Sequence, residues 1–242
     1  MMAALWYRQT KTKIANSVDV AWTFSFSIYA ILGYFLINQD FYLQKSLTAL
    51  ITLTWSLRLG SYLYITRCKN MKNEDSRYSK MREKWSQKDF FIFYQAQALS
   101  ALPLATCLLL AMQNPLSDLS TRHIIAIIIA LVAIIGETLA DKQLNDHKKN
   151  PQMKGKTCQS GLWKYSRHPN YFFEWLHWWA YVALAINTSI GLLSLMGPAL
   201  MLYLFFRVTG IPPTEAAALK SRSDYREYMN KTSVFIPWFP KP

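Results

Sequence analysis

The chain has 242 residues, of which 52% are hydrophobic and 17% are charged, and its formal net charge is +13. A charged content well below the roughly 25% of soluble domains, with the apolar residues gathered in blocks, excludes an ordinary soluble protein and indicates a membrane protein. The three cysteines, Cys68, Cys107 and Cys158, lie far apart without a CxxC pair, so a disulfide framework and a zinc site are not supported.

Six apolar runs follow a short basic N-terminus that shows no cleavable signal sequence. A helix that crosses the hydrocarbon core needs about 20 apolar residues. The runs cover residues 18–37, 46–66, 90–112, 123–140, 171–186 and 191–206, the last two joined by a brief link. We therefore expect an all-α, polytopic membrane protein with about six transmembrane helices, folded as a single membrane domain over residues 1–242.

Lysine and arginine gather on one side of this arrangement. Of the 27 basic residues, 24 lie in the N-terminus and in residues 67–88, 142–170 and 207–242, the segments that six spans place on one face. The positive-inside rule then predicts that both termini and both long loops are cytoplasmic. This distribution accounts for the positive charge without a nucleic-acid partner, and no nucleic-acid-binding motif is present.

The sequence GLWKYSRHPNYFFE, at residues 161–174, places polar side chains at the start of an apolar run. Pro169 suits the first turn of a helix, on which Asn170 and Glu174 share a face. Arg167 and His168 then lie at the positive end of the helix dipole, where a phosphate or carboxylate binds. The alternative is an interfacial anchor in which Glu174 is paired inside the protein.

Two further sites carry ionisable residues inside apolar runs. Glu137 and Asp141 are four apart, so both lie on one helical face. They could serve acid–base chemistry, hold a cation, or accept hydrogen bonds from ribose or amide groups; alternatively the helix end simply reaches water. Arg58 lies in the middle of the second run and should pair with a carboxylate such as Asp19 or Glu137, or face a polar cavity.

Two segments lie outside the runs. The loop sequence NEDSRYSKMREKW favours a solvated, self-paired helix surface with Glu74, Asp75, Arg77 and Tyr78. The tail predicts one cytoplasmic or interfacial helix over about residues 214–228, with Thr214 as its N-cap. The FIPWFP end that follows suits the membrane interface or a docked anchor.

Several common motifs are missing from the sequence. It contains no GxGxxG, no Gly-Lys-Ser/Thr phosphate loop and no GxSxG elbow. Glu174 and His177 are three apart on one helix face, which is only a weak metal signal, so we expect no metal site.

The sequence GLWKYSRHPNYFFEWLHWW, preceded by ETLADKQL and followed by SDYREYMNKTSVFIPWFP, resembles the steroid 5-alpha-reductase-like membrane family. The closest resemblance is to its bacterial branch of uncharacterised membrane proteins, which implies a bacterial inner membrane. VDVAW and EDSRY extend the resemblance over most of the chain.

In the reductases, NADPH is held within the membrane by the cytoplasmic halves of the C-terminal spans. The resemblance therefore implies a cofactor-binding half over residues 123–242 and an NADPH-dependent reduction of a carbon–carbon double bond. The substrate would be lipid-soluble, steroid-like or isoprenoid. Together with the anion-binding helix start, the expected cofactor-binding residues are Asp141, Tyr165, Arg167, His168, Asn170, Tyr171, Glu174 and Tyr228.

The sequence also departs from the reductases. Phe173 replaces the glycine that usually precedes the glutamate, and Glu137 replaces a common asparagine. Ala217 and Ser221 stand where those enzymes have His and Tyr before the tail tyrosine. The Glu–Tyr pair that polarises a steroid carbonyl has no counterpart, so cofactor binding is better supported than steroid reduction and no catalytic residue is assigned.

A second family shares part of this pattern. Isoprenylcysteine carboxyl methyltransferases combine an RHPxY motif with a later Glu, Tyr and Ile-Pro, which match Arg167, His168, Pro169, Tyr171, Glu215, Tyr228, Ile236 and Pro237. That resemblance implies S-adenosylmethionine and methyl transfer. ADKQL, PNYFFE and VDVAW favour the reductase-like branch. A non-catalytic membrane protein with structural ion pairs is the third hypothesis.

Overall fold

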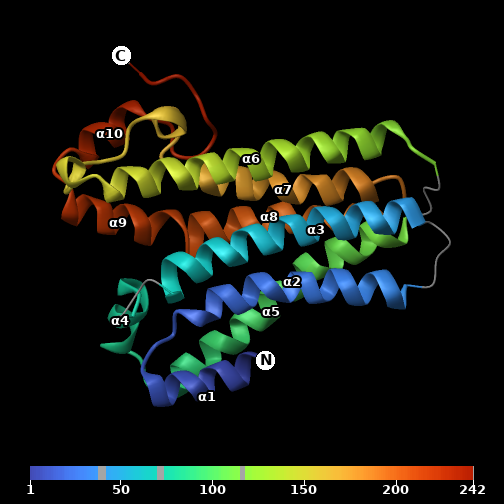
Figure 1. Cartoon of the computed structure of the whole chain (residues 1–242), viewed down its shortest axis with the longest axis horizontal. Helices are drawn as coiled ribbons and strands as arrows, with labels where there is room; N and C mark the ends of the chain where they lie inside the picture. The colour runs from blue at the N-terminus through green and yellow to red at the C-terminus, as the bar shows by residue number, and fades with distance from the viewer. Residues whose placement is uncertain (38–41, 70–73, 115–117, 242) are drawn as a thin grey trace. The chain divides into compact units, whose positions relative to one another are not determined.

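The computed structural model describes residues 1–37, 42–69, 74–114 and 118–241, and no strand occurs among them. The chain forms two compact units (Figure 1). The first comprises Met1–Ser120 and Leu184–Ser194, and the second comprises Thr121–Ala183 and Leu195–Pro242. The predicted cofactor-binding half, residues 123–242, falls largely in the second unit.

Within the described residues, four stretches are long and apolar enough to cross a membrane: α2 (Ser17–Leu36), α5 (Gln87–Gln113), α6 (Thr121–Lys149) and the continuous stretch Ile190–Ser221. The all-helical membrane character predicted from the sequence is therefore confirmed. The two remaining predicted runs are also helical, as α3 (Tyr42–Leu63) and α7 (Pro169–Ala185). However, α7 has only 17 residues, and α3 interleaves its apolar residues with Thr, Ser and Arg58. Length and composition thus mark four spans rather than six.

The first unit packs its helices around α2. This helix packs against α3 and α5, and α5 also packs against α1 (Met2–Thr12). Phe26 of α2 and Trp55 of α3 are fully buried and meet edge to face, with ring centroids 5.4 Å apart. The hydroxyls of Ser27 and Ser56 are 2.8 Å apart beside them, so each polar group has a partner inside this contact. After α3 the chain continues through η1 (Tyr64–Lys69) to α4 (Ser76–Arg82).

A partly buried polar cluster joins the loop around α4 to the first turn of α2. The carboxylate of Asp19 accepts hydrogen bonds from Arg67, from Arg77 at 2.9 Å and from the Tyr78 hydroxyl at 2.6 Å. Arg77 also pairs with Asp75 at 3.2 Å, so the predicted self-pairing of this loop is present. The predicted solvated surface is wrong, because Tyr78 is only 2% exposed. Its burial, reinforced by the Asp19 carboxylate, raises the pKa of the Tyr78 hydroxyl well above its usual value.

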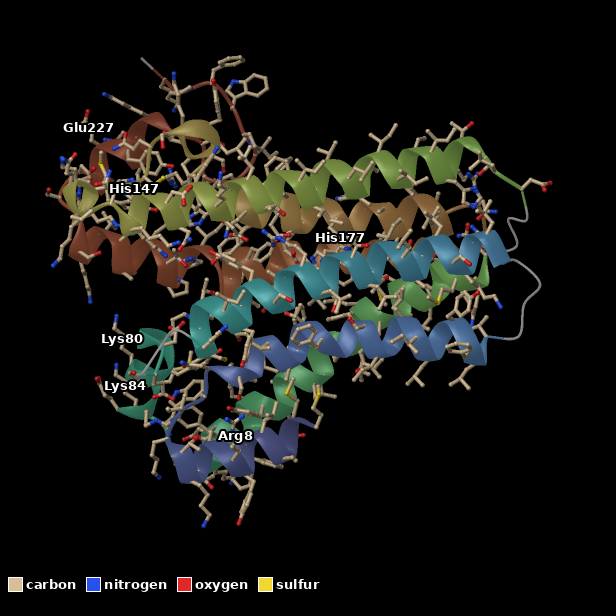
Figure 2. All side chains as sticks on the ribbon, in the orientation of Figure 1. Arg8, Lys80, Lys84, His147, His177 and Glu227 are labelled. Atoms are coloured by element: carbon tan, nitrogen blue, oxygen red, sulfur yellow. The ribbon has the colours of Figure 1, made fainter. Side chains whose placement is uncertain are left out.

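In the second unit, α6 and α7 run alongside each other, and α10 (Tyr225–Lys231) lies at the end where α6 finishes and α7 begins (Figure 1). Figure 2 places His147 and Glu227 at that end and His177 further along α7. The connection from α6 to α7 contains the short helices η2 (Pro151–Met153) and η3 (Gly161–Lys164). After η4 (Ile190–Leu195), the chain returns through α8 (Met196–Tyr203), η5 (Leu204–Val208) and α9 (Ile211–Ser221).

The tail forms two helices, α9 and α10, where one was predicted over residues 214–228. The first begins after Gly210, because the two prolines that follow Ile211 fit a first turn that needs no N–H donors. Thr214 is therefore inside the helix, and its hydroxyl donates to the Gly210 carbonyl rather than capping. Between the helices, the Asp224 carboxylate accepts hydrogen bonds from the Thr157 N–H and hydroxyl at 2.9 and 2.6 Å. This tertiary contact accompanies the break.

Candidate functional site

The turn before α7 rests on the last part of α6. Gly161 has a φ of 59°, and a Cβ there would come within 2.3 Å of the Gln143 side chain, so only glycine fits. The same Gln143 side chain accepts a hydrogen bond from the Leu162 N–H at 2.9 Å. The Trp163 indole N–H donates to the Ala140 carbonyl at 3.0 Å. These contacts fix the entry to α7 against α6.

An ion-pair cluster follows this turn. Glu215 of α9 lies 2.7 Å from Arg167 Nε and 3.2 Å from His168 Nε2, measured to its Oε1 atom. All three side chains are largely buried, at 11%, 3% and 13% exposed for Arg167, His168 and Glu215. Helix α7 begins at Pro169, directly after them, which confirms the predicted helix start. The contacts of Glu215 with Arg167 and His168 therefore join the start of α7 to α9.

Arg167 also holds the C-terminal segment. Its Nη1 donates to the carbonyls of Met229 and Thr232 at 2.8 and 2.9 Å, and its backbone N–H donates to the Ser233 carbonyl at 2.8 Å. We expected Arg167 to meet an anion at the helix start. The structure shows that its Nε and Nη1 are bonded within the protein, so its charge is shared with Glu215.

Two predicted tyrosines join the same contacts. The Tyr228 hydroxyl lies within hydrogen-bonding distance of the carbonyls of Trp163 and Ser166. Burial raises the pKa of this phenol above its usual value, which keeps it protonated as a donor. The Tyr165 carbonyl accepts a hydrogen bond from the Trp238 N–H at 2.9 Å. Residues 163–167 are thus held by α10 and the segment after it.

Stacked rings extend the cluster along α7. The rings of His168 and Tyr171 are stacked with centroids 5.3 Å apart and planes 2° apart. Tyr171 in turn stacks on Phe205 of η5 at 4.7 Å and 9°. This column orients the imidazole whose Nε2 faces Glu215, so the packing and the ion pair support one geometry.

Three buried carboxylates lie on α6 and α7. Glu137 and Asp141 of α6 are 4% and 5% exposed, and Glu174 of α7 is 6% exposed. The two helices approach closely at Gly136, where an added Cβ would lie 2.4 Å from the Phe173 ring. Glu137 and Glu174 directly follow these two residues in the sequence, so each lies near this contact along its own helix. Buried carboxylates are costly unless they are hydrogen-bonded or paired, and inside membrane segments they mark functional sites by default.

A family comparison matches most of the chain. The family model described as protein of unknown function, DUF1295, matches residues 5–232. The chain belongs to the DUF1295 family. Neither the curated proteins nor the solved structures give a match to it.

The geometry divides the predicted site of this DUF1295 protein into two groups. The first is the network around the start of α7, which contains Tyr165, Arg167, His168, Tyr171 and Tyr228. The second is the α6–α7 pair with Asp141 and Glu174, together with the half-buried Asn170 in the first turn of α7. The connection with Trp163 on Ala140 places the first group next to Asp141 along α6.

Glu215 is the main residue that the chemistry of the sequence did not single out; only the methyltransferase resemblance marked it. It is a lone carboxylate in the alanine-rich stretch TEAAALK directly after two prolines, which could have been the signal. Gln143 and Ser166 were also missed. The Ser166 hydroxyl donates to the Phe235 carbonyl at 2.7 Å, a tertiary contact with no local pattern.

The His177 imidazole is hydrogen-bonded within α7. Its Nε2 lies 2.8 Å from the Tyr181 hydroxyl one turn later on α7. Within the part of the chain that the structure describes, no three His, Cys, Asp or Glu side chains are grouped so that they could hold a metal ion.

Proposed function

We propose that this DUF1295 protein is a membrane-embedded oxidoreductase that uses NADPH to reduce a carbon–carbon double bond of a lipid-soluble, steroid-like or isoprenoid substrate. The observation that carries the proposal is the set of three buried carboxylates on α6 and α7, Glu137, Asp141 and Glu174. They lie on helices whose connection carries many cations. The resemblance of the same residues to the steroid 5-alpha-reductase-like family supplies the reaction class.

The residues present fit the chemistry of such a cofactor. Buried carboxylates can accept hydrogen bonds from ribose hydroxyls and from an amide N–H. The last part of α6 and the connection to α7 supply positive charge for phosphates through six exposed lysines: Lys142, Lys148, Lys149, Lys154, Lys156 and Lys164. When bound, NADPH supplies a hydride, and the reduction is completed by a proton.

Within this proposal each group has a role. Asp141 accepts from a ribose or amide group, while Asn170 and Glu174 meet the nicotinamide end. Arg167 and His168 are held by Glu215, so they fix the start of α7, and Arg167 contributes positive charge near the phosphates. Buried Asp141 and Glu174 are on rigid helices, which suits precise orientation of a ligand.

The proposal includes a topology. Six spans, with α3 and α7 added to the four apolar stretches, place the four basic segments on one face of the membrane. The positive-inside rule then puts both termini and residues 67–88 and 142–170 in the cytoplasm, where NADPH is available. The bacterial inner membrane is the location that the family resemblance favours.

Methyl transfer from S-adenosylmethionine is the second candidate. One observation favours it: the residues that match the methyltransferase pattern, Arg167, His168, Tyr171, Glu215 and Tyr228, lie in one connected network. Arg167 contacts Glu215 and the Met229 carbonyl in α10, and Tyr228 lies one residue before it. Under a third hypothesis, these contacts and the buried carboxylates are structural and the protein binds neither ligand.

Ligand-dependent thermal stability of the detergent-purified protein distinguishes these hypotheses. A ligand at one hundred times its dissociation constant stabilises the folded state by about 2.7 kcal/mol. We expect stabilisation by NADPH, a smaller effect of NADH and none by S-adenosylmethionine. Stabilisation by S-adenosylmethionine alone would replace the reductase by the methyltransferase, and no response to any of the three would favour the structural hypothesis.

Matched variants locate the site. Asn170→Ala and Glu174→Gln should weaken NADPH binding by about tenfold or more. The first removes an amide, and the second removes the charge and replaces an acceptor oxygen by an NH2 donor. Glu227→Gln changes an exposed glutamate of α10 and serves as the control. If Glu174→Gln lowers thermal stability without NADPH but leaves its affinity intact, Glu174 has a structural role only.

A further inference from the structure

The segment after α10 forms a closed loop on the second unit. The Lys241 N–H donates to the Lys231 carbonyl at 2.8 Å, so the two ends of the loop meet. Between them, Trp238 and Ser233 are hydrogen-bonded through their backbones to Tyr165 and Arg167. The loop therefore has a defined shape, fixed at its ends and at two points along its length.

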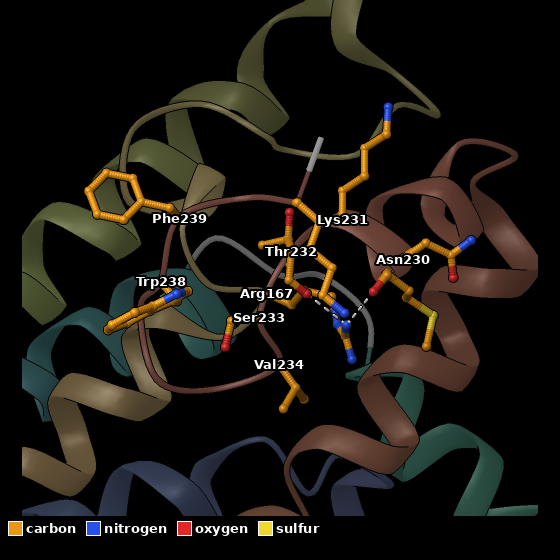
Figure 3. A pocket seen from close by; sticks show the side chains of 10 residues that line it. Arg167, Asn230, Lys231, Thr232, Ser233, Val234, Trp238 and Phe239 are labelled. Carbon is orange, nitrogen blue, oxygen red and sulfur yellow. Dashed lines mark hydrogen bonds between the residues drawn. The ribbon is translucent and has the colours of Figure 1, made fainter.

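This loop lines an open cavity of about 450 Å³ (Figure 3). No carboxylate occurs among its described lining residues, whereas three cations and several hydroxyl or amide donors do. Arg167 shares its charge with Glu215, and Lys231 pairs with the exposed Glu227 at 2.8 Å. Solvent weakens the second pair, so the balance of the lining is positive. The residues that matter for charge and shape are Arg167, Lys231, Thr232, Trp238, Phe239 and Lys241.

Large apolar side chains surround the same cavity and remain uncovered. Trp238 and Phe239 are 70% and 75% exposed, and neighbouring Ile236 is 59% exposed. The rings of Phe239 and Tyr165 meet edge to face, with centroids 6.0 Å apart. A water-soluble loop gains nothing by exposing three such side chains in four residues, whereas Trp, Phe and Tyr are favoured at the boundary between headgroups and acyl chains.

The position of this loop along the chain favours a location at the membrane surface. The apolar stretch Ile190–Ser221 ends only ten residues before Lys231, and α10 intervenes. The loop therefore emerges shortly after a helix that can cross the bilayer. Cations next to exposed aromatic side chains at this point match a headgroup region with negatively charged phosphates.

We propose that this cavity binds the phosphate headgroup of an anionic phospholipid. Lys231 and Lys241 contact the phosphate, and Trp238 and Phe239 enter the adjoining acyl region. The site positions the loop, and with it residues 165–167, at a defined depth in the bilayer. It does not require the reductase activity proposed above. A free phosphate or a nucleotide would use the cations but would leave the apolar side chains exposed.

The test measures thermal stabilisation of the full-length protein in an uncharged detergent. The probes are phosphatidylglycerol, phosphatidylcholine of the same acyl chains, and inorganic phosphate. We expect phosphatidylglycerol to act at concentrations about tenfold or more below those of phosphatidylcholine, since each lysine near an anionic lipid adds attraction. Inorganic phosphate at matched concentration should have no comparable effect.

Two double variants make the test specific. Lys231→Gln/Lys241→Gln should remove the preference for phosphatidylglycerol. Lys80→Gln/Lys84→Gln removes the same charge from exposed positions outside the cavity and should keep it. The proposal would be overturned if the two lipids stabilised the protein equally. It would also be overturned if the first variant kept the preference for phosphatidylglycerol, or if the second variant lost it to the same extent as the first. If inorganic phosphate stabilised the protein as strongly as phosphatidylglycerol does, the cavity would be a site for free anions, and the lipid assignment would be overturned.

Trp238→Ser/Phe239→Ser tests the apolar part of the site. These exposed side chains contribute little to the folded core, so the variant should fold. The concentration of phosphatidylglycerol needed for half-maximal stabilisation should rise by about tenfold, because the apolar area buried in the lipid is lost. An unchanged concentration would show that the acyl region is not contacted and would overturn that part of the proposal.

Discussion

Glu215 contacts three side chains of the candidate site through a single atom. Its Oε1 atom lies 2.7 Å from Arg167 Nε, 3.2 Å from His168 Nε2 and 3.5 Å from the Tyr225 hydroxyl. Arg167 then bonds the Met229 carbonyl and the rest of the C-terminal segment. A single carboxylate of α9 thus joins the start of α7 to α10, so its charge should be needed for stability.

Glu215→Gln should lower the free energy of unfolding by about 3 kcal/mol. The substitution keeps the volume but leaves the Arg167 charge largely buried without its carboxylate, and removing one partner of such a pair is strongly destabilising. Thermal unfolding without ligand measures the effect. Glu227→Gln is the control, because its partner Lys231 and the carboxylate are exposed and such pairs contribute less than about 0.5 kcal/mol. Equal shifts in both variants would contradict a structural role for the Glu215 charge.

The pairing of individual charged side chains could not be predicted from the sequence. Asp19 and Glu137 were the candidate partners for Arg58, with a polar cavity as the alternative. In the structure Asp19 bonds Arg67 and Arg77, and the Arg58 guanidinium lies 5.6 Å from the Tyr62 ring centroid. The need for a partner follows from the cost of a buried charge, but the choice of partner depends on how the chain folds back.

At the scale of elements, α6 and α7 approach closely although α7 lacks the glycine that the reductase resemblance leads one to expect. The reductase resemblance expects a glycine before Glu174, and Phe173 stands there instead. The structure places Gly136 of α6 opposite Phe173, so the glycine that permits close approach lies on the other helix. The buried carboxylates of both helices depend on this packing.

Gly136→Ala should destabilise the protein by about 1–3 kcal/mol, because the new Cβ would lie 2.4 Å from the Phe173 ring and the contact would be overpacked. Thermal unfolding measures the loss, and NADPH affinity should fall with it if the two helices hold the cofactor. Phe173→Leu in the same chain should recover part of the stability. If the two substitutions are simply additive, the contact does not determine the packing.

Helix positions were predicted better than helix ends. Helix α2 begins and ends within one residue of its predicted run, since a long uninterrupted apolar stretch defines it. The tail was different, because its division into α9 and α10 involves Thr157, about 67 residues before Asp224. Hydrogen bonds to Thr157 outweigh the effect of burial and lower the pKa of Asp224, so this carboxylate stays ionised in the contact. Local patterns cannot show such a contact.

At the scale of the whole chain, sequence and structure agree on an all-helical membrane protein and differ on the number of marked spans. The apolar character of α2, α5 and α6 is plain from composition, whereas α3 and α7 are helical but more polar or shorter. The charge distribution favours six spans over four, because six spans place all four basic segments on one face and four spans do not. Labelling from one side of the membrane can therefore decide between four and six.

Single cysteines give opposite patterns for the two topologies. The three native cysteines are first replaced by alanine. Single cysteines are then introduced at exposed positions: Lys11→Cys, Lys80→Cys, Asp118→Cys, Lys154→Cys and Glu227→Cys. An impermeant maleimide added to spheroplasts labels those that face the outside. With six spans and a cytoplasmic N-terminus, only Asp118→Cys is labelled before permeabilisation. With four spans, Lys80→Cys and Lys154→Cys are labelled and Asp118→Cys is protected. Lys11→Cys and Glu227→Cys are protected in both cases, so they report membrane integrity. The four-span pattern would separate residues 67–88 and 142–170 from the cytoplasm and from NADPH, and would remove the topological basis of the proposed reductase.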